Sequence, residues 1–250
     1  KFKPETPNMD FPFSVKPDRK LSVRDVMALT RDKSEGTVFD PVRGLRGGPF
    51  KNPNYYRGTR LISVPNVEYT TLTQCRSWLP DPVGGLVWVA LGAQDTSCYV
   101  PFYAGATELP KSFGIGDHYV LDRRSARWAF DYVDFHVQVA YNAAIEDVKA
   151  ARKTWEDGAI DTVAEIDARA AELHKKSPRE AVRHVTGFGL NNADNVVAAW
   201  WKLGDDLWVK YNHLSLYDPA KRRTGRIPTA GPEWWNKAVR AFDVLAEPDK

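Results

Sequence analysis

A chain of 250 residues is long enough for one large domain or two small ones, and 43% hydrophobic and 27% charged residues are typical of a globular protein. The formal net charge of +3 comes from interspersed acidic and basic residues, which argues against the basic stripe of a nucleic-acid-binding protein. No apolar run approaches the roughly 18 residues that span a bilayer, and the start shows no signal-peptide pattern. The nine tryptophans predict a large aromatic core.

The first 58 residues contain one predicted helix between irregular segments. Residues 1–20 are rich in Pro, Lys and Asp and are predicted to be extended. Ser22 matches a helix N-cap, with Asp25 three residues later as a variant capping box, which predicts a helix over residues 23–31. Prolines and glycines then break the pattern, and residues 33–58 are predicted to form a long structured loop. A loop this long in a compact domain is usually functional or covers another element.

The β-structure is predicted to centre on residues 69–92. A Thr-rich run over residues 69–78 and the apolar run LVWVAL over residues 86–91 flank the segment LPDPVGG, whose prolines and glycines favour a reversal. This pattern predicts an antiparallel hairpin, with the apolar strand covered on both faces. Further strands are predicted at residues 59–64 and 98–104, the second at a sheet edge because it contains Pro101.

The character of the sequence changes at Ser125, where helical periodicity begins. Asp157-Gly158 is predicted to interrupt the first helix, and Ser177-Pro178 gives a strong N-terminal signal for a later one. The predicted helices cover residues 125–155, 159–176, 178–185 and 192–211, followed by a loop over 212–231 and a last helix from Pro232. Segregated strands and helices indicate an α+β fold, with a β-rich portion over residues 1–124 and a helical region over residues 125–250.

The common catalytic and metal-binding motifs are absent, because no CxxC, HExxH, GxSxG or P-loop spacing occurs. The two cysteines, Cys75 and Cys98, lie at the ends of predicted strands. Either could be a buried thiol, or the two could form a disulfide in an exported protein. As nucleophiles they are disfavoured, since no histidine stands near Cys75 in the sequence.

With these elements placed, the sequence resembles the family C69 dipeptidases, cysteine-type members of the N-terminal-nucleophile (Ntn) hydrolase superfamily. The resemblance runs in the family's order through nearly the whole chain. The segments that carry it are residues 12–40, the glycine-rich GLRGGPFKNP at 44–53, residues 69–92 with CYVPFYAGATELP at 98–110, SARWAFDYV at 125–133 and AAWWKLGDDLWVKYN at 198–212.

What the resemblance implies is an αββα sandwich that hydrolyses short peptides, with no metal or organic cofactor. The family's nucleophile is a cysteine at the mature N-terminus, whose thiolate attacks the amide carbonyl while its own α-amino group accepts and returns the proton. An oxyanion hole stabilises the tetrahedral intermediate, and water resolves the acyl-enzyme.

This sequence departs from the family pattern at its start, where Lys1 stands and no cysteine is near. We therefore expect the chain to correspond to the C-terminal half of the family, inactive alone, with the nucleophile on a separate or missing N-terminal part that would be its partner. No catalytic residue is carried over. The alternatives are a non-catalytic binding or scaffold module of the same fold, or an Ntn acylase acting on non-peptide amides. A periplasmic or secreted location is favoured over a cytoplasmic one, and a homo-oligomer is possible.

Two residues are predicted to contact substrate. Arg76 and Trp78 would share one face of the first hairpin strand, opposite Cys75, and Arg76 could bind a substrate carboxylate in bidentate fashion. The alternative for Arg76 is an ion pair at the surface or between layers. Asp95, Thr96 and Ser97 follow the second strand and are expected mainly to shape a turn.

The remaining candidates are histidines and paired tryptophans. The five histidines show no ligand spacing, and only His118, beside Asp117, is a candidate for testing. In each of the pairs Trp200-Trp201 and Trp234-Trp235, one ring is expected in the core and the other over a neighbouring element, with a sugar-binding platform as the alternative.

Overall fold

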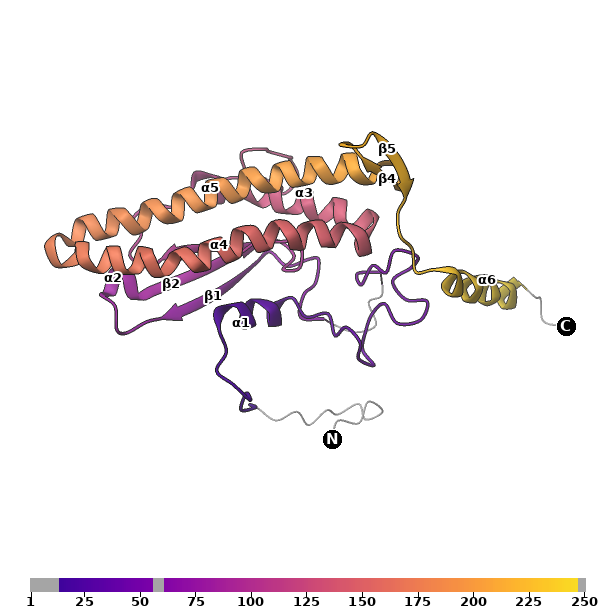
Figure 1. Cartoon of the computed structure of the whole chain (residues 1–250), viewed down its shortest axis with the longest axis horizontal. Helices are drawn as coiled ribbons and strands as arrows, with labels where there is room; N and C mark the ends of the chain where they lie inside the picture. Colours follow the sequence, from indigo (N-terminus) through magenta and orange to yellow (C-terminus); the bar gives the residue numbers. More distant parts are fainter. Residues whose placement is uncertain (1–13, 56–60, 247–250) are drawn as a thin grey trace.

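In a computed structural model of the chain, residues 14–55 and 61–246 are described. They form an α+β fold, in which long helices lie along a small antiparallel sheet (Figure 1). The sheet consists of β1 (Tyr69–Cys75), β2 (Gly85–Leu91) and β3 (Val100–Tyr103), in that order. The helices that pack along it are α3 (Ala126–Val139), α4 (Tyr141–Lys176) and α5 (Pro178–Tyr211). The predicted α+β fold class is thus confirmed.

The predicted hairpin is present, and its loop contains the one-turn helix α2 (Asp81–Gly84). β2 is the central strand, and its alternate residues enter two different core clusters. Leu86, Trp88 and Ala90 pack with residues of α1 (Val23–Thr30), α4 and α5, whereas Val89 and Leu91 pack against a cluster built mainly on α3 and α5. β2 is therefore covered on both faces, as its apolar composition predicts. Pro101 lies on β3, an edge strand, in agreement with its missing N–H donor.

Two helix starts are confirmed by their caps. Ser22 and Asp25 form a reciprocal capping box at α1, and the Ser177 side chain accepts a hydrogen bond from the Glu180 backbone at the start of α5. The last helix, α6 (Pro232–Ala246), begins at the predicted proline. Figure 1 shows α6 projecting from the end of the molecule at which β4 (Ser215–Asp218) and β5 (Arg223–Arg226) pair.

Several predicted boundaries are wrong. The first long helix breaks at Ala140, and α4 then continues through Asp157-Gly158 without interruption. The two helices predicted over residues 178–185 and 192–211 form one continuous helix, α5, which includes Gly187 and Gly189. Tertiary packing outweighs the low helix propensity of these glycines. A Cβ at Gly189 would lie 3.2 Å from the Phe102 ring, so this glycine lets α5 approach β3 closely.

Two β predictions also need correction. Residues 61–64 form no strand, while residues 59–60 lie outside the described part of the chain. The segment 212–231 is not a simple loop, since it contains the β4–β5 hairpin. The exposed β5 sequence RTGR has no apolar alternation that could have revealed it. Among the described residues, no helix is both long and apolar enough to cross a membrane.

Candidate functional site

A cleft with a volume of about 730 Å³ lies between α1, the turn that follows it and the N-terminal half of α4. Its walls carry charges of both signs. The basic residues are Arg19, Arg24, Arg31, Lys33, Lys149 and Arg152, and the acidic ones are Asp25, Asp32, Glu35, Asp95, Glu156 and Asp157. A cleft of this composition can hold a ligand that has both a cationic and an anionic group.

The outer wall of the cleft is fixed by ion pairs between α1 and α4. Arg24 donates to Asp157 at 2.9 Å and to Asp161 at 2.8 Å. These charges are exposed, so they contribute little to stability but set how α1 lies against α4.

The inner wall is built around Glu156. This carboxylate receives two hydrogen bonds from the Arg31 guanidinium, one of them from Nη1 to Oε2 at 3.0 Å, and a third from the Tyr99 backbone N–H at 2.8 Å. Both side chains of the ion pair are nearly buried. The Arg31 guanidinium also lies 4.9 Å from the Tyr99 ring centroid, and its Nε donates to the Gln94 carbonyl. The end of α1 is thereby tied to α4 and to the segment after β2.

Arg152 lies one helical turn before Glu156 on the same wall. Its Nη1 donates to the Asp95 carbonyl at 2.8 Å. Burial lowers the pKa of this guanidinium, and the positive charge of Arg31 lowers it further. Among the described residues, 14–55 and 61–246, no carboxylate forms an ion pair with Arg152.

The floor of the cleft is a buried polar centre on Asp95. Its carboxylate accepts hydrogen bonds from the hydroxyls of Ser63 at 2.9 Å and Tyr141 at 2.6 Å, and pairs with Lys33 Nζ at 3.2 Å. Lys33 is only 2% exposed and also donates to the Ser63 carbonyl. Burial and the Asp95 charge raise the pKa of the Tyr141 phenol, which therefore stays protonated at neutral pH. Residues 33, 63, 95 and 141 are thus joined in one network.

A second carboxyl adjoins this centre. Asp134 accepts hydrogen bonds from Thr96 Oγ1 at 2.8 Å and from Gln138 Nε2 at 3.0 Å. Burial and the nearby charge of Asp95 raise the pKa of Asp134 to about 6. This carboxyl can therefore exchange its proton close to neutral pH. The described residues contain no cluster of three or more His, Cys, Asp or Glu side chains arranged to hold a metal ion.

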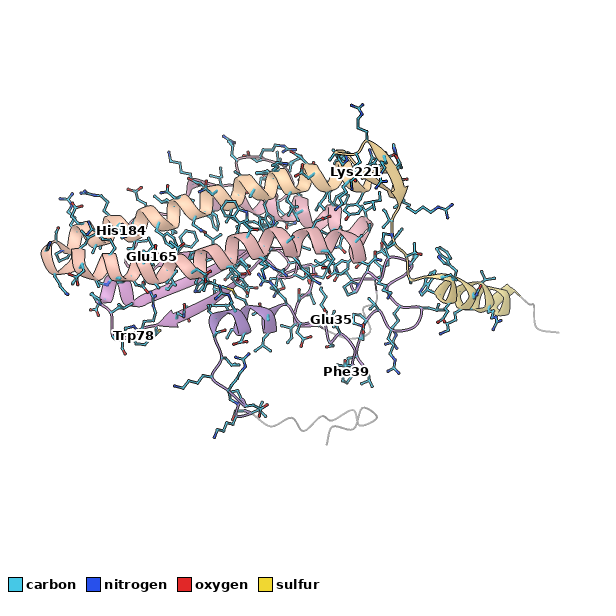
Figure 2. The ribbon with its side chains drawn as sticks, in the orientation of Figure 1. Glu35, Phe39, Trp78, Glu165, His184 and Lys221 are labelled. Atoms are coloured by element: carbon cyan, nitrogen blue, oxygen red, sulfur yellow. The ribbon has the colours of Figure 1, made fainter. Side chains whose placement is uncertain are left out.

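The predicted pair Arg76 and Trp78 does not share a face. β1 ends at Cys75, and the chain turns where the Leu79 N–H bonds to the Arg76 carbonyl. Arg76 is buried and pairs with Asp167, whereas Trp78 is 77% exposed. Figure 2 shows Trp78 beyond the end of β1, well away from Glu35 at the cleft. Arg76 thus has the interlayer ion pair named as its alternative, and a substrate contact by either residue stays a prediction.

The other candidates from the sequence are the polar residues 95–97 and the two cysteines. Asp95 and Thr96 lie in the predicted turn, in which the Thr96 N–H donates to the Ala93 carbonyl, and Asp95, Thr96 and Ser97 are all buried. Cys75 is an exposed free thiol, opposite to the buried Arg76 as alternation predicts, and Cys98 is a buried free thiol. Burial and the charge of Glu156 raise the pKa of Cys98 well above its usual range, so it is poorly suited to act as a nucleophile.

The histidine and tryptophan predictions are only partly met. His118 is exposed and has an edge-on contact with Tyr119. Trp200 is fully buried, Trp201 packs on the Tyr132 ring of α3 at a centroid distance of 5.3 Å, and Trp235 is 47% exposed. Trp200 Nε1 donates to the Thr96 carbonyl, which ties α5 to the polar floor.

The sequence prediction missed Lys33, Tyr141, Arg152 and Glu156. A lysine inside a long loop carries no local signal of burial. Arg152 and Glu156 do have the i, i+4 spacing of one helix face, but the predicted end of that helix at residue 155 separated them.

The segment that contains most of this cleft also carries a family match. The model of Peptidase family C69 matches residues 1–154, more than half of the chain. The chain belongs to peptidase family C69. The matched segment includes Arg31, Lys33, Asp95, Tyr141 and Arg152, so much of the cleft is formed by the C69 portion of the chain.

Curated relatives of this C69 chain are named as dipeptidases. A "Probable dipeptidase" of Latilactobacillus sakei is 29% identical over 184 residues, which is 68% of this chain and 38% of that protein. A "Probable dipeptidase B" of Lactococcus lactis subsp. lactis is 26% identical over 56% of this chain and 26% of its own length. A "Probable dipeptidase B" of Streptococcus pyogenes serotype M1 is 24% identical over 71% and 36%. The aligned segments thus span about a quarter to two fifths of these relatives.

Proposed function

We propose that this chain is the C-terminal portion of a cysteine-type Ntn dipeptidase, which hydrolyses short peptides through an acyl-enzyme. The observation that carries the proposal is the match of residues 1–154 to peptidase family C69, together with relatives that are named dipeptidases. The sheet with helices packed along it is compatible with one part of an αββα sandwich.

The nucleophilic cysteine would lie on a separate or preceding N-terminal part, which would be the partner of this chain. Neither thiol described here suits the role, because Cys98 is buried and Cys75 lies on a strand outside the cleft. The thiolate would attack the peptide carbonyl, the α-amine of the same residue would carry the proton, and water would release the acyl group.

The residues described here would supply the substrate-binding side of the reaction. A dipeptide is a zwitterion at neutral pH, with an ammonium and a carboxylate close together. The cleft between α1 and α4 presents acidic and basic side chains within one cavity, which suits such a substrate better than a longer, uncharged chain segment. Charged groups at each end of the ligand would orient the scissile bond.

The test is performed on protein purified from its source, with every chain that co-purifies. Intact-mass measurement and N-terminal sequencing establish whether a chain that begins with cysteine accompanies this one. The same material is then assayed with a panel of dipeptides and of non-peptide acyl-amides. Cleavage of dipeptides by material that contains such a chain supports the proposal. Preference for acyl-amides would indicate an acylase, and an absence of hydrolysis would indicate a binding or scaffold module.

A further inference from the structure

Arg152 differs from the other arginines of the cleft in how its charge is balanced. Arg24 has two carboxylate partners, and Arg31 has Glu156. Arg19 pairs with Asp25. For Arg152 the described structure gives only the Asp95 main-chain carbonyl as an acceptor. Its guanidinium has five N–H donors, so most of its hydrogen-bonding capacity is unused by the described residues.

The nearest carboxylate on the same helix face cannot supply the missing partner. Both Glu156 oxygens are already engaged by Arg31, and Oε1 also accepts the Tyr99 backbone N–H. The guanidiniums of Arg31 and Arg152 therefore both lie near Glu156, but only Arg31 is paired with it. A partly buried cation in this position favours an added anion, because a buried charge is stable only when it is paired.

We propose that Arg152 binds the C-terminal carboxylate of the peptide substrate and so selects for short peptides with a free C-terminus. The inference rests on the proposed dipeptidase function and assigns a specificity-determining residue within it. It also moves the predicted carboxylate-binding role from Arg76, whose guanidinium is occupied by Asp167 and by the carbonyls of Val83 and Gly84, to Arg152.

The shape and charge of the cleft agree with a carboxylate at this position. A guanidinium binds a carboxylate through two parallel N–H donors, which fixes both the position and the plane of the ligand. Asp32 and Glu35 line the same cleft and supply negative charge for the substrate ammonium. The charge of Glu35 reaches the Tyr141 phenol, which places it close to the polar floor. The two ends of a dipeptide would thus meet charges of opposite sign.

The test is calorimetric titration of the 250-residue chain with the dipeptide alanyl-alanine and with its C-terminal amide. Wild type should bind the free acid about ten- to hundredfold more tightly than the amide, as expected for charge-assisted hydrogen bonds. Arg152→Gln should remove this preference, and Arg152→Lys should keep part of it. The control Lys153→Gln removes the same charge from the adjacent, exposed position on α4 and should leave the preference unchanged.

The inference is overturned if acid and amide bind equally, if neither binds, or if the preference survives in Arg152→Gln. Thermal unfolding of each variant shows whether the chain is folded, and Arg152→Lys carries the test if Arg152→Gln is not. Failure of the proposed function is seen separately, in the hydrolysis assay on source material. A chain that prefers the free acid but belongs to a protein without dipeptidase activity would refute only the proposed function.

Discussion

The Glu156 carboxylate is predicted to be the most sensitive charged group of the cleft. It lies on α4 and is the acceptor for two Arg31 donors and for the Tyr99 backbone N–H. The side chains of Glu156 and Arg31 are 9% and 12% exposed. Glu156→Gln keeps the size of the residue but removes its charge, which leaves Arg31 without its carboxylate partner and beside the positive charge of Arg152.

The magnitude follows from this geometry. Removing one partner of a buried, hydrogen-bonded ion pair costs about 3–5 kcal/mol, because the remaining charge stays desolvated. Glu156→Gln should therefore lower the free energy of unfolding by about 3–5 kcal/mol. Adding Arg152→Gln should restore about 1 kcal/mol, because it removes a like charge beside Arg31.

The assay is urea unfolding followed by tryptophan fluorescence. A matched control is Glu146→Gln on the same helix, whose pair with Lys149 is exposed and worth at most about 1 kcal/mol. If Glu156→Gln were no more destabilising than Glu146→Gln, the inner wall could not be held together by this carboxylate. If Arg152→Gln further destabilised the Glu156→Gln variant, the claim of an unbalanced positive charge would be wrong.

Three further predictions concern a buried carboxyl, the two thiols and two glycines. Because the folded-state pKa of Asp134 is raised to about 6 from 3.8, the folded chain holds this proton more tightly, and stability is lost as pH rises from about 4 to 6. The free energy of unfolding of Asp134→Asn should therefore rise relative to that of wild type by about 2–3 kcal/mol between pH 4 and pH 7, as measured by denaturant unfolding at each pH. A difference between the two proteins that does not change with pH would contradict this. A thiol reagent should label Cys75 in the native chain and Cys98 only after unfolding, and equal native rates would refute the burial of Cys98. Gly204→Ala should destabilise the chain by about 1–3 kcal/mol, because the added Cβ would lie 2.3 Å from the Tyr132 ring. Gly187→Ala meets open space and should stabilise α5 by about 0.5–1 kcal/mol. If Gly204→Ala unfolded at a higher temperature than Gly187→Ala, this description of the packing would be wrong.

The parts of the fold that could be predicted are those fixed by local chemistry. The capping residues at Ser22 and Ser177 mark helix starts because their side chains satisfy backbone donors within one turn. The 69–92 hairpin is marked by two β-type runs around a Pro/Gly segment. In both cases the interaction that decides the structure lies within a few residues along the chain.

The parts that could not be predicted depend on contacts between distant segments. α4 continues through Gly158, although glycine weakens a helix, because residues on both sides of it pack or pair with other elements. Trp78 leaves the face of Arg76 because the chain turns immediately after that residue. The partners of the Lys33 ammonium lie 21 to 62 residues away along the chain, and those of the Glu156 carboxylate lie 57 to 125 residues away. Local sequence patterns do not predict such long-range pairs.

The resemblance to family C69 carried more of the functional prediction than any single residue did. It identified the family correctly, as the match of the C69 family model to residues 1–154 shows. It did not predict the cleft between α1 and α4, because the candidate substrate-binding residues came from the hairpin, at Arg76 and Trp78. The structure gives Arg76 a carboxylate of its own and leaves Arg152 without one among the described residues.

The most direct test of the central claim is dipeptide hydrolysis by protein from its natural source, compared with the 250-residue chain alone. We predict that the source protein cleaves dipeptides and contains a cysteine-initiated part, and that the isolated chain binds dipeptides without cleaving them. Hydrolysis by the isolated chain, or none by the source protein, would contradict it.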